Sequence, residues 1–363
     1  MAALLAGRRV EPAVLAGVDP GEFCRDAERH GVLPLVAERL AALGETPAGL
    51  AARLRERAQG HIATDLAREA ALRELVGAFD GAGLAALVVK GAMLAYSHYP
   101  RPDLRPRLDS DVLIAERDCR AAHELLVRLG YGPEVQAGTD LILYQRPYVL
   151  RRHGAAVHVV DLHWRLVNPQ AFRAVFDYDE LAAGSIGLPA LCAAARGLSA
   201  MHALAIACVH PVAHHLDDER LIWLYDIHMI ACGLRGEDWS RFRTLAADRR
   251  VVAICRASLE RAAELFDTPV PDGLWCEPAS GSPRSPEPTG RYLRPKRRHA
   301  EVVLDDLRGA AGWAERWRMI RAHVFPPAAY MREVYAPSSP RPLVWLYLRR
   351  AIVGASKWLR RPS

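Results

Sequence analysis

The chain has 363 residues, and 51% of them are hydrophobic, which is enough for a large core and excludes a mostly disordered protein. The formal net charge of +6 is concentrated at one end, because 341–363 holds six basic residues and no acidic one. Removing these six from the 48 basic residues leaves 42, equal to the 42 acidic residues. The charge therefore does not indicate a basic groove, and we do not expect binding to long nucleic acid.

Other global features bear on the number of domains and the compartment. The length suggests about two or three domains. No apolar run approaches the roughly 20 residues that a membrane-spanning helix needs, and the N-terminus lacks the charge order of a signal peptide. The seven cysteines are scattered without a Cys-x-x-Cys pair, which is typical of reduced thiols. These features predict a cytoplasmic protein.

The N-terminal part of the chain is predicted to be helical. Leu, Ala and Val recur at three- and four-residue spacing between Arg and Glu through 22–31, 34–43 and 47–79, which is the periodicity of helices with one buried face. We expect 1–82 to form an N-terminal helical region.

A mixed pattern follows this region. Short apolar runs rich in Val, Ile and Leu are typical of buried strands, and glycine and proline clusters separate them. The strands are expected at 84–89, 108–114, 141–150 and 155–164, and a helix at 117–129. Strands mixed with helices predict an α+β core over 83–190.

The remaining chain returns to helical spacing. We expect a helical domain over 191–268 and C-terminal helices over 299–363, with a break at Phe325-Pro-Pro. Between them, 269–298 is rich in Pro, Gly, Ser and Arg, which predicts a flexible linker.

The last segment is predicted to be a basic amphipathic helix. On an ideal helix, five basic residues fall within about 120° of arc, namely Arg349, Arg350, Lys357, Arg360 and Arg361. The opposite side holds Val344, Leu348, Ile352, Ala355, Trp358 and Leu359. Such a helix is typical of contact with an anionic membrane or an acidic partner protein. We favour the alternative that its apolar side packs on the protein's own body.

The clearest candidate for chemistry is the Asp109-Ser-Asp111 motif in the second predicted strand. Alternate side chains of a strand share a face, so the two carboxylates point the same way, about 7 Å apart. Like charges repel unless a cation lies between them, and Mg²⁺ prefers carboxylate and phosphate oxygens. Asp161 lies in a similar apolar strand, so three carboxylates converge if the strands pair. Asp161 would then also help to activate an attacking hydroxyl.

On its own, a D-x-D motif is more often a solvated turn, but a lysine–glycine pair after the first predicted strand favours a phosphate site. Glycine lets backbone amides approach a phosphate, and lysine adds a point charge. Lys90 is one of only three lysines beside 45 arginines. We expect Lys90, Gly91 and Arg105 to contact phosphate, although Lys90 is also placed to cap the strand. Arg107 is expected to lie in a solvated loop or to pair with Asp103.

Several other residues are accessory candidates. His163 shares the strand face of Asp161, and either contacts acceptor or metal or is a packed strand histidine. His210 and His214 have the spacing of one helix face; we interpret them as contacts to acceptor or nucleotide, because zinc needs further ligands. Asp226 is interpreted as a buried hydrogen-bonding acid. Four tryptophans are interpreted as core residues, namely Trp223, Trp239, Trp313 and Trp317.

Taken in chain order, these residues resemble the nucleotidyltransferase superfamily with the DNA polymerase β-type palm, and most closely its bacterial branch of uncharacterised nucleotidyltransferase-family proteins. In the core, the resemblance runs through Val89-Lys90-Gly91-Ala92, Tyr99-Pro100, Arg105, Asp109-Ser-Asp111-Val-Leu and Val160-Asp161-Leu-His163-Trp. It continues in His210, His214, Leu221, Trp223, Leu224, Asp226 and Ile227, and in parts of 325–350.

The resemblance implies a mixed sheet flanked by helices, and ATP or another NTP bound through Mg²⁺ or Mn²⁺. The implied reaction is transfer of a nucleoside monophosphate to a small molecule, peptide or protein, with release of pyrophosphate. Asp109 and Asp111 are then metal ligands, and Asp161 is the third carboxylate. Lys90, Gly91 and Arg105 then bind the nucleotide. The chain departs from the superfamily at Gly91-Ala92, where Gly-Ser is usual. This departure supports an alternative, an inactive protein that senses nucleotide or binds a partner.

Overall fold

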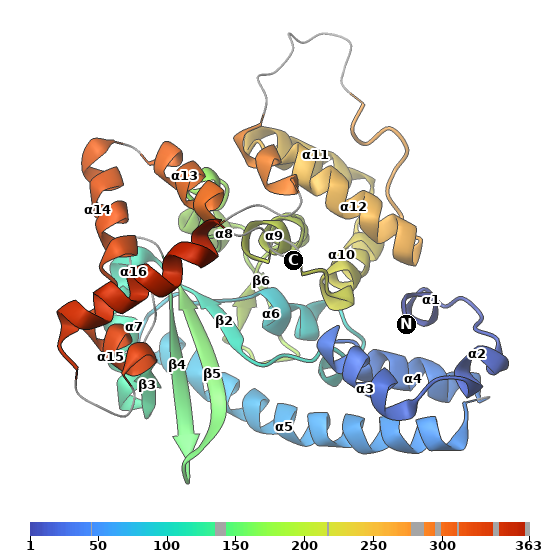
Figure 1. Ribbon diagram of the computed structural model, residues 1–363. Helices are drawn as coiled ribbons and strands as arrows, with labels where there is room; N and C mark the ends of the chain where they lie inside the picture. The colour runs from blue at the N-terminus through green and yellow to red at the C-terminus, as the bar shows by residue number, and fades with distance from the viewer. Residues whose placement is uncertain are drawn as a thin grey trace.

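The computed structural model describes residues 1–44, 46–134, 143–215, 218–276, 287–294, 299–310, 312–336 and 341–359. It has the α+β architecture predicted from the sequence, with a mixed seven-stranded sheet surrounded by helices (Figure 1). All seven cysteines have free thiols. Within the described residues, no helix combines the length and the apolar composition needed to cross a membrane.

Five helices form the N-terminal region, and the longest runs along the underside of the molecule in Figure 1. They are α1 (Ala2–Leu5), α2 (Pro12–Ala16), α3 (Pro20–Arg29), α4 (Leu33–Leu43) and α5 (Ala48–Gly81). The start of α3 is favoured by Pro20 in its first turn and by Asp19, whose carboxylate accepts a hydrogen bond from the Glu22 amide at 2.6 Å. α4 ends at Gly44, which adopts a φ of +70°. α5 buries apolar residues near both of its ends and packs against α3, α4 and the sheet.

The seven strands form one sheet in the order β3-β4-β5-β2-β1-β7-β6. They are β1 (Leu87–Val89), β2 (Ser110–Leu113), β3 (Tyr131–Pro133), β4 (Gln145–Arg152), β5 (Ala155–His163), β6 (Ile186–Gly187) and β7 (Arg196–Gly197). β1 and β2 are buried along their whole length because they lie at the centre of the sheet. β2 is antiparallel to β1 and parallel to β5, so its two neighbours approach it from opposite directions.

Short helices connect the strands. α6 (Lys90–Ser97) follows β1 directly, α7 (Cys119–Arg128) lies between β2 and β3, and α8 (Tyr178–Ala183) precedes β6. Three 3-10 turns complete the connections, at Pro102–Leu104, Glu116–Asp118 and Gln170–Phe172.

The helical part that follows the sheet begins later than the predicted 191, because β7 pairs with β1 before it. Its helices are α9 (Ala200–His214), α10 (Leu221–Gly233), α11 (Gly236–Asp248) and α12 (Val252–Phe266). α9 packs against α10, α11 and α12 and also against α6. Because α6 follows β1 directly, the helical layer lies beside the end of β1 (Figure 1).

Part of the predicted linker 269–298 is folded. Pro288–Leu293 forms a 3-10 helix, and the Tyr292 ring is buried with its centroid 4.9 Å from that of Phe172. The prediction of a flexible linker therefore does not hold for Pro288–Leu293, which an aromatic contact fixes to the body. Residues 277–286 and 295–298 lie outside the described part of the chain.

Four helices end the chain: α13 (His299–Gly309), α14 (Trp313–Val324), α15 (Ala328–Tyr335) and α16 (Leu343–Leu359). The predicted break at Phe325-Pro-Pro separates α14 from α15. α13 packs on the 3-10 turn at Gln170–Phe172, and α16 packs against α13 and α15.

The orientation of α16 differs from the interpretation that we favoured. Its buried contact is made by Leu346, with the Tyr347 hydroxyl donating to the Pro326 carbonyl at 2.7 Å. Val344, Leu348 and Ile352, which were expected to pack inward, face solvent instead. The helix docks through the side that the hydrophobic pattern did not single out. The side chains of 353–359 and all of 360–363, including Lys357, Arg360 and Arg361, lie outside the described residues.

The four tryptophans interpreted as core residues differ in their environment. Trp239 is buried as expected, whereas Trp313 and Trp317 on α14 are exposed. Trp223 is half-buried and lines a cavity.

Candidate active site

The register of two parallel strands brings the predicted carboxylates together. Asp111 on β2 lies directly opposite Asp161 on β5, so the two side chains share one face of the sheet. On the other side of β2, Asp111 is opposite Val89, the last residue of β1. The chain therefore places Lys90, at the end of β1, beside the same carboxylate. The predicted convergence of Asp111 and Asp161 is present in the structure.

Lys90 and His163 both contact Asp111. The Lys90 Nζ donates to Asp111 Oδ1 at 2.8 Å, and His163 Nε2 lies 2.8 Å from the same oxygen. Burial would raise the pKa of Asp111, but the Lys90 charge and the His163 contact outweigh it and leave this pKa below its usual range. Burial, reinforced by the Lys90 charge, lowers the pKa of His163. Lys90 reaches this position from a φ of +52°, a conformation that a lysine rarely adopts.

Three side chains have the geometry of a metal-binding group. Ligand atoms of Asp111, Asp161 and His163 all lie within 4.8 Å of one another. Two carboxylates and one imidazole provide both the oxygen donors that Mg²⁺ and Mn²⁺ prefer and a nitrogen donor. The Asp161 carboxylate also accepts a hydrogen bond from Gln145 Nε2 at 3.1 Å, which orients it. The group therefore fits a divalent cation.

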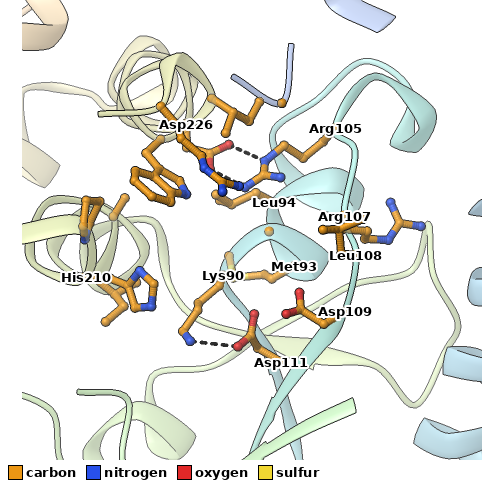
Figure 2. Close-up of a pocket in the computed structure, with 18 of the residues that line it drawn as sticks. Lys90, Met93, Leu94, Arg105, Arg107, Leu108, Asp109, Asp111, His210 and Asp226 are labelled. Atoms are coloured by element: carbon orange, nitrogen blue, oxygen red, sulfur yellow. Dashed lines mark hydrogen bonds and ion pairs between the residues drawn. The ribbon is translucent and has the colours of Figure 1, made fainter. Parts of the chain in front are cut away.

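Asp109, the first acid of the motif, lies beside this group but outside it. Its carboxylate points towards Asp111 and Lys90 in the close-up (Figure 2), and it is half-buried in the wall of the cavity. Burial first, and then the Asp111 charge, raise the pKa of Asp109 to about 6. The same two causes, in the same order, raise the pKa of Asp161 to about 7. Negative charge is crowded here, as expected of a place that a cation neutralises.

A hydrogen-bonded chain supports the motif from the opposite face of the sheet. His158 Nε2 lies 2.9 Å from Ser110 Oγ, and His158 Nδ1 lies 2.7 Å from the Tyr131 hydroxyl. All three residues are buried. Burial, with Arg68 and Arg107 nearby, lowers the pKa of His158 to about 4, so the ring is neutral near pH 7. Ser110 separates the two acids, so this chain holds the strand that presents them.

Arg105, which is predicted to contact nucleotide, pairs with Asp226 of α10 and also lines the cavity beside the carboxylates. Its Nε and Nη2 donate to the two carboxylate oxygens of Asp226 at 2.8 and 2.7 Å, and its Nη1 donates to the Pro106 carbonyl. The Tyr99 hydroxyl donates to the same carboxylate at 2.7 Å. Because every guanidinium nitrogen is engaged, we interpret Arg105 as the link between the loop before β2 and α10. Asp226 is the buried acid that was predicted.

Gly91 allows this pair to form. A Cβ at position 91 would lie 2.9 Å from Arg105 Nη2 and 3.1 Å from its Cζ. Packing against Arg105 therefore explains a glycine at position 91, independently of any contact with a phosphate. The predicted glycine turn is in fact the first turn of α6, which begins at Lys90. Arg107 is buried and donates to the Tyr96 hydroxyl at 2.9 Å, whereas Asp103 accepts from Arg101. Arg107 is therefore structural, with a partner other than the one expected.

A cavity of about 500 Å³ extends from the carboxylates to the helical layer, a size typical of small-molecule sites. Figure 2 shows Lys90 and His210 facing each other across it. His214 also lines it and accepts a hydrogen bond from the Asn168 amide at 3.3 Å. Burial lowers the pKa of His214 to about 3. Both histidines are therefore at the cavity, as the prediction requires, although neither is within the metal-binding group.

Sequence reasoning missed several residues of the cavity wall. The His215 ring stacks on Trp223 with centroids 4.3 Å apart, and the Arg220 guanidinium lies 5.3 Å from the Trp223 ring. The N-terminal helices contribute Glu28 and His61. The strand alternation contained a signal for Gln145, which is opposite His163 in the β4–β5 register. For the helical residues no local signal exists, because packing of distant segments brings them to the cavity.

Two aspartates and a histidine on adjacent strands, with Lys90 beside them at the edge of the cavity, form a group that fits a divalent metal ion. The family model described as uncharacterised nucleotidyltransferase matches residues 16–267, and the chain belongs to this family. The match includes the sheet and α9 to α12 but not the C-terminal helices.

Comparisons with individual proteins add little to the family assignment. No curated protein matches the chain. Among solved structures, an antigenic nucleotidyltransferase-like protein from Paracoccidioides brasiliensis is similar, with 15% identity and a TM-score of 0.33 over 54% of this chain and 92% of that chain.

Proposed function

We propose that the protein is a divalent-metal-dependent nucleotidyltransferase, which transfers a nucleoside monophosphate from ATP or another NTP to an acceptor. The observation that carries this proposal is the register of β2 and β5, which places Asp111 opposite Asp161 with His163 within ligand distance. The family to which the chain belongs supports the same reaction class.

In this proposal Asp111, Asp161 and His163 hold Mg²⁺ or Mn²⁺, and Asp109 adds negative charge at the cavity side. The bound ion would supply charge neutralisation for the triphosphate. Lys90, whose Nζ lies 2.8 Å from Asp111 Oδ1, would supply positive charge for a phosphate oxygen. The acceptor oxygen forms a bond to the α-phosphorus, and the bond from the α-phosphorus to the bridging oxygen breaks. Its electrons leave with pyrophosphate, and the acceptor proton passes to solvent.

We propose that the acceptor, or the base of the nucleotide, lies against the helical layer. His210, His214 and Trp223 line that side of the cavity. The two imidazoles are half-buried, and because burial lowers their pKa they are neutral near pH 7, so they offer hydrogen bonds without charge. The bounded volume favours a small molecule or a peptide segment as acceptor.

The test uses the full chain with Mg²⁺ or Mn²⁺ and NTPs labelled at the α- or the γ-phosphate, with and without cell extract. We expect α-label to appear in an acceptor fraction and γ-label to appear in pyrophosphate. Asp111→Asn should lower the transfer rate by about a hundredfold or more, because it removes a metal ligand. Asp80→Asn, the same change at the exposed end of α5, is the matched control and should leave the rate unchanged. Transfer of γ-label to the acceptor, or equal rates in both variants, would contradict the proposal.

A second function is favoured by one observation. Ala92 is buried in the first turn of α6, at the position where the superfamily usually has a serine that contacts phosphate. A protein that binds nucleotide to sense it or to recruit a partner would need no such hydroxyl. Equilibrium binding of a non-hydrolysable ATP analogue, together with no pyrophosphate release from any NTP, would identify this second function.

A further inference from the structure

The described part of α16 exposes a continuous apolar stripe to solvent. Val344, Leu348 and Ile352 are 81, 59 and 69% exposed, and their four-residue spacing places them along one side of the helix. The opposite side packs on the body, where Leu346 is completely buried. The helix is therefore held in place while its more apolar side is left uncovered by the described residues. Ordered exposure of this kind usually marks an interaction surface.

Arginines and an aromatic ring border the stripe. Trp345 is 40% exposed, and the guanidinium carbons of Arg341 and Arg349 lie 4.4 and 5.7 Å from its ring centre. Arg349 Nη1 also donates to the Tyr335 carbonyl at 2.9 Å, which fixes this arginine on α15. The surface thus combines an apolar centre, a tryptophan at its edge and fixed positive charge beside it.

The charge of the surrounding segment is strongly one-sided. Residues 312–363 contain ten basic and two acidic residues, which leaves 38 basic and 40 acidic residues in the rest of the chain. No acidic residue follows Glu333. The body is therefore slightly acidic, while the segment around α16 has a large positive surplus. Its electrostatic complement is a densely anionic surface.

We propose that α16 binds the surface of an anionic lipid bilayer, with its axis in the plane of the membrane. Val344, Leu348 and Ile352 enter the boundary between headgroups and acyl chains, and Arg341 and Arg349 contact lipid phosphates. A bilayer fits better than a protein groove because the stripe is a single convex helix face bordered by arginine and tryptophan. No described helix has the length and apolarity to span a membrane, so the contact is peripheral.

The experiment measures flotation of the full chain with vesicles of phosphatidylcholine alone and with vesicles that also contain phosphatidylglycerol. We expect binding to the anionic vesicles only, and weaker binding at high salt because ions screen the arginines. Leu348→Asp should lower the partition coefficient by about tenfold or more. Leu66→Asp, at a leucine of α5 that is 62% exposed, is the matched control and should bind like the wild type. Arg341→Gln with Arg349→Gln should lower binding and reduce its salt dependence.

Two results would overturn the inference. One is equal partition of Leu348→Asp and Leu66→Asp into anionic vesicles. The other is absence of binding to anionic vesicles at low salt. If the wild type then self-associates in light scattering and Leu348→Asp does not, the stripe binds a second copy of the chain instead of a membrane. Circular dichroism of each variant checks folding, and because Leu348 is exposed we expect unchanged spectra.

Discussion

Two buried acid–base pairs flank the same cavity and differ in kind. Arg105 and Asp226 form a two-pronged pair with side-chain exposures of 10 and 6%, and Tyr99 adds a third hydrogen bond to the carboxylate. Lys90 and Asp111 form a single hydrogen bond with exposures of 15 and 11%, and the accepting oxygen is shared with His163. The planar guanidinium fixes its partner's orientation, whereas an ammonium group on a flexible stem is a point charge that can pivot.

This difference separates a structural pair, Arg105–Asp226, from an adaptable pair, Lys90–Asp111. The Arg105–Asp226 pair joins segments 121 residues apart, and each of the three guanidinium nitrogens donates a hydrogen bond. The Lys90–Asp111 pair lies among two further carboxylates, so its charges can be redistributed when a cation or a phosphate enters. We therefore expect changes at the first pair to affect stability and changes at the second pair to affect ligand binding.

The largest expected effect on stability comes from breaking the first pair. Asp226→Ala leaves the Arg105 guanidinium buried without a counter-charge, which should cost about 4 kcal/mol of unfolding free energy. Asp111→Ala should cost much less, about 1 kcal/mol or below, because the cavity admits water to Lys90 and because one of several crowded carboxylates is removed. Urea denaturation of the two variants measures both values, and equal losses would refute the distinction between the pairs.

The sequence could predict the face on which the acids lie but not all of their partners. Alternation along two apolar strands placed Asp111 and Asp161 correctly, because strand periodicity is local and both strands are long enough to show it. The position of His163 on the same face was also readable. His163, and not Asp109, completes the group because β2 begins at Ser110, after Asp109. No local sequence pattern indicates that strand boundary.

Other features depend on long-range packing. Arg105 and Asp226 are far apart in the chain, so their pairing leaves no periodic signal, and an arginine before two acids was more naturally read as a phosphate ligand. For α16, helical periodicity distinguished two sides but not which of them packs on the body. The two-residue strands β6 and β7 are too short to show any alternation.

A metal titration identifies which side chains around the adaptable Lys90–Asp111 pair hold the cation. Mn²⁺ at about 100 times its dissociation constant should raise the unfolding free energy of the wild type by about 2.7 kcal/mol, because only the folded state presents the ligands together. Asp161→Asn should lose this increment, and His163→Gln should lose more of it than Asp109→Asn. Thermal unfolding with and without Mn²⁺ measures the increments. If Asp109→Asn loses the most, the metal is held by the three carboxylates instead of the group with His163.

The smallest expected effect distinguishes packing from phosphate contact at Gly91, which follows Lys90 in the chain and lies against Arg105. Gly91→Ala adds a Cβ that must displace a guanidinium already fixed by Asp226, so we expect a loss of about 1 kcal/mol in unfolding free energy. Gly77→Ala on α5 is the matched control: its Cβ meets nothing within 4 Å, so the change should stabilise the helix by up to about 1 kcal/mol. The opposite signs would show that crowding against Arg105, not helix propensity, decides the outcome at position 91. Affinity for an ATP analogue should be unchanged in Gly91→Ala if the glycine serves the Arg105–Asp226 pair. A marked loss of affinity without a loss of stability would instead show that the Gly91 backbone contacts the phosphates and belongs with Lys90 and Asp111 in the ligand site.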